Sequence, residues 1–74
     1  MNITVKLFAS FRTGRFEIES MEYPDGTTVA DVVDSLNLQQ SELGIMLVNS
    51  RHVKLDHLLV EGETLAIFPL LGGG

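Results

Sequence analysis

Apolar and polar residues alternate at the start of the chain, as they do in a β-strand with one buried face. The apolar residues at every second position are Ile3, Val5, Leu7 and Ala9. Successive side chains of a strand point to opposite faces, so these residues form the predicted core face. Phe8 falls on the other face, where it is either exposed or covered by a helix as part of a second core face.

A second strand is predicted over residues 16–23, "FEIESMEY", where Phe16 and Ile18 share one face. It follows the turn sequence "RTGR", in which Gly14 permits a tight reversal of the chain. The two strands are therefore expected to form a hairpin.

The segment "PDGTTVADVVDSL" predicts a turn followed by an amphipathic helix. Pro24 and Gly26 are typical turn residues, and Thr28 with Asp31 resembles the capping box that starts a helix. The apolar residues that follow have the spacing of one helix face: Val29, Val32, Val33 and Leu36. Because valine is a weak helix former, packing against a sheet must stabilise this helix of about two to three turns.

The second half of the chain predicts a loop and then further strands. "NLQQSELG" has no regular pattern and is expected to be a loop in which Leu43 turns back onto the domain. "IMLV" is a short apolar strand that Asn49 ends, and "HVKL" is its expected return. Gly62 lies at the turn of the loop "DHLLVEGET", after which "LAIF" forms a last strand, predicted to be buried on both faces.

This order of elements predicts an α+β fold. It consists of a mixed sheet of about four to five strands with one main helix packed across it. A hairpin followed by a helical crossover back to the sheet is the β-grasp, or ubiquitin-like, arrangement. The expected domain covers residues 1–69, and residues 70–74 form a flexible C-terminal glycine tail.

Composition narrows the class of protein. The 74 residues suffice for one domain, and 45% of them are hydrophobic, enough for one modest core. The chain has no cysteine, which excludes disulfides, thiolate metal sites and cysteine-ligated iron–sulfur clusters. No segment resembles a signal peptide or approaches the length of a membrane span, so we expect a cytoplasmic protein that is not processed at its start.

The net charge of the chain is −5, from five Lys and Arg residues against ten Asp and Glu residues. This balance disfavours nucleic acid as a partner and suits a protein with a basic docking face. A negative net charge that serves only to keep the protein soluble is the alternative explanation.

Side chains offer little for catalysis or metal binding. His52 and His57 lack further His or Cys ligands in the sequence, so we expect surface histidines and no metal site. The acidic residues around Gly62 are expected to lie in a solvated turn: Asp56, Glu61 and Glu63. No serine has a general base beside it in sequence, so no nucleophile is assigned.

Four segments of the chain resemble the small sulfur-carrier proteins: "KLFASFR", "PDGTTVADVVDSL", "LVN" and "LVEGETLAIFPLLGGG". The resemblance covers essentially the whole chain, and its most specific part is Phe68 and Pro69 followed by a glycine end. The small subunit of molybdopterin synthase (MoaD) is the most similar type, with the thiamine-pathway carrier (ThiS) second. Molybdopterin members usually carry a second proline where this chain has Leu70.

The resemblance implies that the carboxylate of Gly74 is the reactive group and that the chain has no catalytic activity alone. In this family an E1-like adenylating enzyme (MoeB/ThiF-like) uses ATP to form an acyl-adenylate, and a sulfur donor protein supplies the sulfur of a thiocarboxylate. The large subunit of molybdopterin synthase (MoaE-like) is the implied partner in sulfur transfer. The chain itself is expected to bind no cofactor, no nucleic acid and no membrane.

The tail is expected to enter a narrow channel of these partners, where residues without a Cβ fit best. The residues expected there, besides the terminal one, are Pro69, Leu70, Leu71, Gly72 and Gly73. Family tails have six residues from the first proline to the end, and so does the segment from Pro69 to Gly74. The count makes Gly73 and Gly74 the active pair and Gly72 a tolerant position.

Docking is expected to depend on the body of the domain, because ordering five tail residues costs about 5–10 kcal/mol. The expected anchors are Phe8, Phe68 and Leu70, joined by Arg12, whose alternative is an ordinary solvated charge. A different hypothesis is a ubiquitin-like interaction or conjugation module, in which the terminal carboxylate becomes an amide with lysine.

Overall fold

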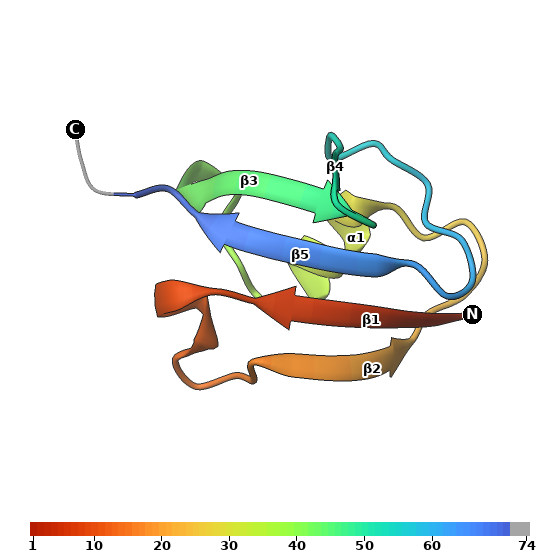
Figure 1. The fold of residues 1–74 in the computed structure, drawn as a ribbon, viewed down its shortest axis with the longest axis horizontal. Coiled ribbons are helices and arrows are strands. Elements are labelled where there is room, and N and C mark those ends of the chain that lie inside the picture. The colour runs from red at the N-terminus through yellow and green to blue at the C-terminus, as the bar shows by residue number, and fades with distance from the viewer. Residues whose placement is uncertain (72–74) are drawn as a thin grey trace.

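The computed structural model of the chain describes residues 1–71. Within that range five strands form one sheet in the order β2-β1-β5-β3-β4, and the helix α1 lies across one face of it (Figure 1). The strands are β1 (Asn2–Leu7), β2 (Ile18–Glu22), β3 (Leu43–Val48), β4 (Arg51–His52) and β5 (Thr64–Pro69). The helices are α1 (Val29–Ser35) and two 3₁₀ helices, η1 (Ala9–Arg12) and η2 (Gln40–Glu42).

The sheet is mixed because its central strand β5 is parallel to one neighbour and antiparallel to the other. β1 pairs with β5 in parallel and with β2 antiparallel, and β5 pairs with β3 antiparallel. A parallel pair needs a crossover connection, and the segment that contains α1 supplies it. This arrangement confirms the predicted α+β, β-grasp fold. It also brings the C-terminal ends of β1 and β5 to the same end of the domain (Figure 1).

The core lies between α1 and the sheet. The largest fully buried side chains are Ile3, Val5 and Leu7 of β1, Leu65 and Ile67 of β5, and Val29, Val32 and Val33 of α1. These residues confirm the predicted core face of the first strand, apart from Ala9, and the predicted helix stripe, of which Leu36 is partly buried. None of the helices within residues 1–71 has the length and apolar character needed to cross a membrane.

The start of α1 confirms the predicted capping box. The Asp31 backbone N–H donates to Thr28 Oγ1 at 3.2 Å, and the Thr28 backbone N–H donates to Asp31 Oδ2 at 2.9 Å. Gly26 has a φ of +93° in the preceding turn, which a residue with a side chain rarely adopts. The helix has seven residues, so it makes about two turns.

The first hairpin is confirmed, but its strands are shorter than predicted. β1 ends at Leu7 because Ala9, with a φ of +52°, starts the 3₁₀ helix η1 and is exposed. Phe11 of η1 fills the core and is only 5% exposed. Phe16 precedes β2 and packs against the core, whereas Ile18 is 55% exposed, so the two do not share a buried face.

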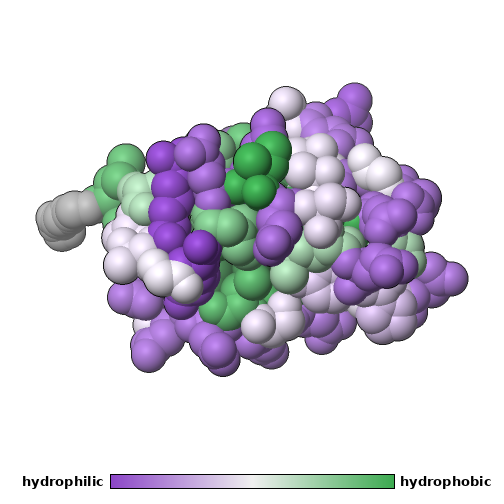
Figure 2. Space-filling model, turned by 90° about the horizontal axis from the view of Figure 1, so that it is seen from below, coloured by the Kyte–Doolittle hydropathy of each residue, from purple (hydrophilic) through white to green (hydrophobic). Residues whose placement is uncertain are grey.

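The edge of the sheet at β2 carries charged and apolar residues together. Seen from that side, polar surface borders a strip of apolar surface (Figure 2). Glu19 and Glu22 of β2 are exposed at this edge. Charges on an edge strand hinder pairing with other chains, so this edge is protected.

Two predictions about the later strands are corrected. The return after Asn49 and Ser50, whose φ angles are 49° and 70°, is limited to Arg51–His52 and does not extend over "HVKL". β5 alternates between buried and half-buried residues, so it has one buried face and not two. No helix in the described part of the chain covers the second face of the sheet, and Phe68 lies on that face.

Candidate functional site

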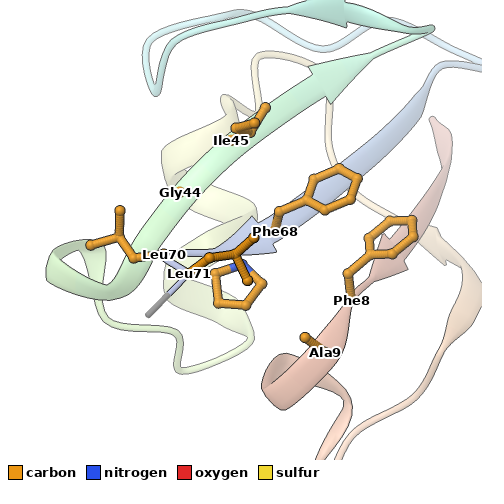
Figure 3. Close-up of a pocket in the computed structure, with 8 residues that line it drawn as sticks. Phe8, Ala9, Gly44, Ile45, Phe68, Leu70 and Leu71 are labelled. Carbon is orange, nitrogen blue, oxygen red and sulfur yellow. The ribbon is translucent and has the colours of Figure 1, made fainter. Parts of the chain in front are cut away.

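Two phenylalanines stack on the open face of the sheet, beside the base of the tail. Phe8 directly follows β1 and Phe68 is the penultimate residue of β5 (Figure 3). Their ring centroids are 4.0 Å apart with an interplanar angle of 11°. The Phe8 backbone N–H donates to the Ile67 carbonyl at 3.3 Å, which extends the parallel ladder and fixes the spacing of the rings. Phe8 is therefore on the open face and not under the helix.

Arg12 belongs to the same cluster. Its guanidinium carbon lies 5.4 Å from the centroid of the Phe8 ring, within the range of a cation–π contact. Its Nε donates to the Leu7 carbonyl at 2.8 Å, and its Nη2 is 4.0 Å from Glu17 Oε2. The side chain is thus held beside the aromatic pair and is not simply solvated, while its part in docking stays a prediction.

An apolar groove of about 360 Å³ runs between the aromatic pair and the start of β3. We call it the tail-base groove, and it is lined by Phe8, Ala9, Gly44, Ile45, Phe68, Pro69, Leu70 and Leu71. Leu70 and Leu71 are 63% and 87% exposed at its outer end (Figure 3). The structure thus brings together every predicted docking and tail residue up to Leu71, and Gly72, Gly73 and Gly74 lie outside the described residues.

Sequence reasoning missed Gly44 and Ile45 as part of this site. Gly44 was assigned to a loop, but it lies in β3 against the backbone of Pro69. A glycine next to an apolar strand segment is the signal that was available, because such glycines often mark a close approach of another backbone.

The surface around Phe8 is less acidic than the chain as a whole. A hollow next to the tail-base groove is lined by Lys6, Phe8 and Arg12 together with Glu17 and Ile18. Two of the five Lys and Arg residues of the chain therefore lie beside Phe8. A partner that covers this surface meets both signs of charge around an apolar centre.

The acidic residues around Gly62 are only partly as predicted, because Asp56 and Glu61 are exposed while Glu63 is partly buried. The side chain of Glu63 is only 14% exposed, and its Oε1 accepts the Val60 backbone N–H at 2.7 Å. Glu61 Oε1 accepts the Asn2 backbone N–H at 2.9 Å. The Glu61 carboxylate thus ties the loop to the start of β1, and the Glu63 carboxylate closes the turn within the loop.

The two histidines are separate from the tail-base groove. His57 Nε2 is 3.5 Å from Glu63 Oε1 and otherwise buried without a hydrogen-bond partner, and His52 is exposed. Within residues 1–71 no group of three His, Asp or Glu side chains has the spacing needed to hold a metal ion.

Comparison with known proteins gives one family and several similar structures. The sequence matches the ThiS family over residues 5–74. No curated protein matches it in sequence. A candidate molybdopterin converting factor subunit 1 from Pyrococcus furiosus is 28% identical, with a TM-score of 0.76 over 96% of this chain and 99% of that chain.

Two further structures share the fold at lower identity. SAMP1 from Haloferax volcanii is 24% identical, with a TM-score of 0.77 and coverage of 100% of both chains. A chain from the complex of subunits 1 and 2 of the molybdopterin-converting factor of Helicobacter pylori 26695 is 16% identical, with a TM-score of 0.67 and the same full coverage.

Proposed function

Because the chain belongs to the ThiS family, we propose that it carries sulfur as a thiocarboxylate on Gly74. The chain is a ubiquitin-fold sulfur carrier or modifier of the ThiS/MoaD type. The observation that supports the finer proposal is the tail-base groove, an apolar docking surface placed where the glycine tail leaves the domain. The reactive group is then a main-chain carboxylate, and no side chain of this protein has to react.

The proposed reaction has two steps. The Gly74 carboxylate attacks the α-phosphorus of ATP in an E1-like adenylating enzyme, which forms the acyl-adenylate and releases pyrophosphate. A hydrosulfide equivalent from a sulfur donor protein then attacks the carbonyl carbon. The bond between this carbon and the phosphate oxygen of AMP breaks, and AMP leaves. The product is the thiocarboxylate. The proposed location is the cytosol, where ATP is available.

The affinity for partners has to come from the body of the domain. Ordering one backbone residue costs about 1–2 kcal/mol, and glycines have no side chain that offsets this. The stacked rings of Phe8 and Phe68 and the exposed Leu70 provide apolar area beside the tail. We therefore propose these three residues as anchors, with Arg12 paired to a carboxylate of the partner.

Molybdopterin synthesis is the pathway that we propose for the sulfur. The P. furiosus relative with 28% identity is described as subunit 1 of a molybdopterin converting factor, which supports a large-subunit partner of the MoaE type here. The match to the ThiS family keeps the thiazole of thiamine as the second candidate acceptor.

Intact mass tests the proposal directly. The full chain is incubated with ATP, an adenylating enzyme of the MoeB/ThiF type and a sulfur source, and a mass increase equal to exchange of one oxygen for one sulfur is expected. An unchanged mass, with an enzyme that converts its own carrier, would contradict it. An amide bond from Gly74 to a lysine would indicate a modifier instead. Transfer of the sulfur to a molybdopterin precursor or to a thiazole precursor, each with its own synthase, separates the two pathways.

A further inference from the structure

The ladder between β3 and β5 is irregular at the base of the tail. The pairs on either side of the irregularity are Leu43 with Pro69 and Met46 with Ile67. Gly44 and Ile45 therefore face a single residue of β5, Phe68, which is the arrangement of a β-bulge. The bulge places the backbone of Gly44 directly against the last residue of β5.

Gly44 is required by space and not by backbone conformation. An ideal Cβ at this position would lie 2.6 Å from the Pro69 carbonyl oxygen and 3.1 Å from the Leu70 nitrogen. The φ of Gly44 lies outside the left-handed region, so alanine could adopt its backbone conformation. The other described glycines differ: Gly14, Gly26 and Gly62 have positive φ and open space around them.

A hydrogen bond also holds Leu70, the residue after Pro69, next to the start of β3. The Leu70 backbone N–H donates to the Glu42 carbonyl at 2.8 Å, one residue beyond the last ladder pair. Glu42 ends η2 immediately before β3, so its carbonyl is fixed by the start of that strand. Pro69 between these contacts is buried and its φ is fixed by its ring.

We propose that Gly44 and the Glu42 carbonyl form a tail guide, which fixes the direction in which the tail leaves the domain. The inference rests on the proposed function and adds a positioning role for Gly44 in adenylation of Gly74. A Cβ at Gly44 would lie 2.6 Å from the Pro69 oxygen, closer than real Cβ contacts, so the Pro69 backbone has to move away from β3. Displacement of a reacting group by about 1 Å can lower a rate by about 100-fold.

The test compares Gly44→Ala with Gly62→Ala. Gly62 lies at the opposite end of β5, and alanine at its φ of +84° is strained and lowers stability without touching the tail. For Gly44→Ala we expect faster hydrogen exchange of the Leu70 amide and a kcat for adenylation lower by about 10- to 100-fold. The KM for the carrier should change little, because the aromatic pair is intact. Gly62→Ala should match the wild type in all three measurements.

Two results would overturn the tail guide: unchanged Leu70 exchange in Gly44→Ala, or faster exchange with wild-type kcat. If Gly44→Ala does not fold, an ester bond in place of the Leu70 amide, introduced by semisynthesis, decides, because it removes the N–H donor and keeps both Gly44 and the leucine side chain. A lower kcat in this variant supports the guide and a wild-type kcat contradicts it. If the wild-type chain is not adenylated at all, the proposed function fails, and Leu70 exchange still tests the guide as a structural feature.

Discussion

At the scale of single residues, the aromatic pair is the feature that packing of the domain explains least. Phe8 and Phe68 are half-buried on the open face of the sheet, and each ring covers the other and not the core. Such a pair contributes about 0.5–1.5 kcal/mol beyond the area it buries. The sequence left the face of Phe8 open, because alternation shows that Leu7 and Phe8 point to opposite sides but not which side a helix covers. The pairing of β1 with β5 sets Phe8 beside Phe68 and so shows that Phe8 lies on the open face.

We predict that Phe68→Asp leaves the domain folded and weakens its association with the adenylating enzyme by at least about tenfold. The substitution places a charge at the centre of the apolar surface and ends the stacking with Phe8. Leu58→Asp is the matched control, because Leu58 is 60% exposed but does not line the tail-base groove. Isothermal titration with circular dichroism measures both. Equal affinities for the two variants would remove Phe68 from the interface.

At the scale of elements, the sequence predicts best what neighbouring residues determine. The helix and its cap depend on contacts within four residues, and both were predicted correctly from Thr28, Asp31 and the valine spacing. The end of β1 was not predicted correctly. It depends on the burial of Phe11 in the core and on the positive φ of Ala9, and the alternation of apolar and polar residues indicates neither of them. The bulge at Gly44 depends on β5, which is distant in sequence.

We predict that Thr28→Ala lowers the free energy of unfolding by about 1 kcal/mol. The change removes the acceptor for the Asp31 N–H, and the valine-rich helix has little intrinsic stability to compensate. Thr13→Ala is the control, since Thr13 is exposed in a turn outside the helix. Urea unfolding gives both values. A loss no larger than that of the control would show that packing alone holds the start of α1.

At the scale of the whole molecule, the parallel pairing of β1 and β5 brings the proposed docking surface and the base of the tail to one end. Phe8 comes from the first strand's end and Phe68 from the last strand's end, and the tail leaves from the same place (Figure 1). One partner surface can therefore hold the body and receive the tail. The tail beyond Leu70 starts from a fixed point, since the Leu70 N–H is bound to the Glu42 carbonyl.

A fixed starting point makes the length of the tail decisive. From Leu71 to Gly74 four residues reach about 14 Å when fully extended, at about 3.4 Å each. We predict that Gly72→Ser retains thiocarboxylate formation and that Gly73→Val loses it, because a branched side chain crowds the channel. Deletion of Gly74 should also lose it, although two glycines still end the chain. Pyrophosphate release measures adenylation in all three variants.

The deletion separates two explanations of the glycine end. It preserves the sequence of a glycine pair and withdraws the carboxylate by about 3.4 Å from the nucleotide. A tail that could slide along the domain would recover this distance, but the hydrogen bond at Leu70 and the contact of Gly44 with Pro69 oppose sliding. Full activity of the deletion alone would mean that the terminal glycine pair matters and the distance does not.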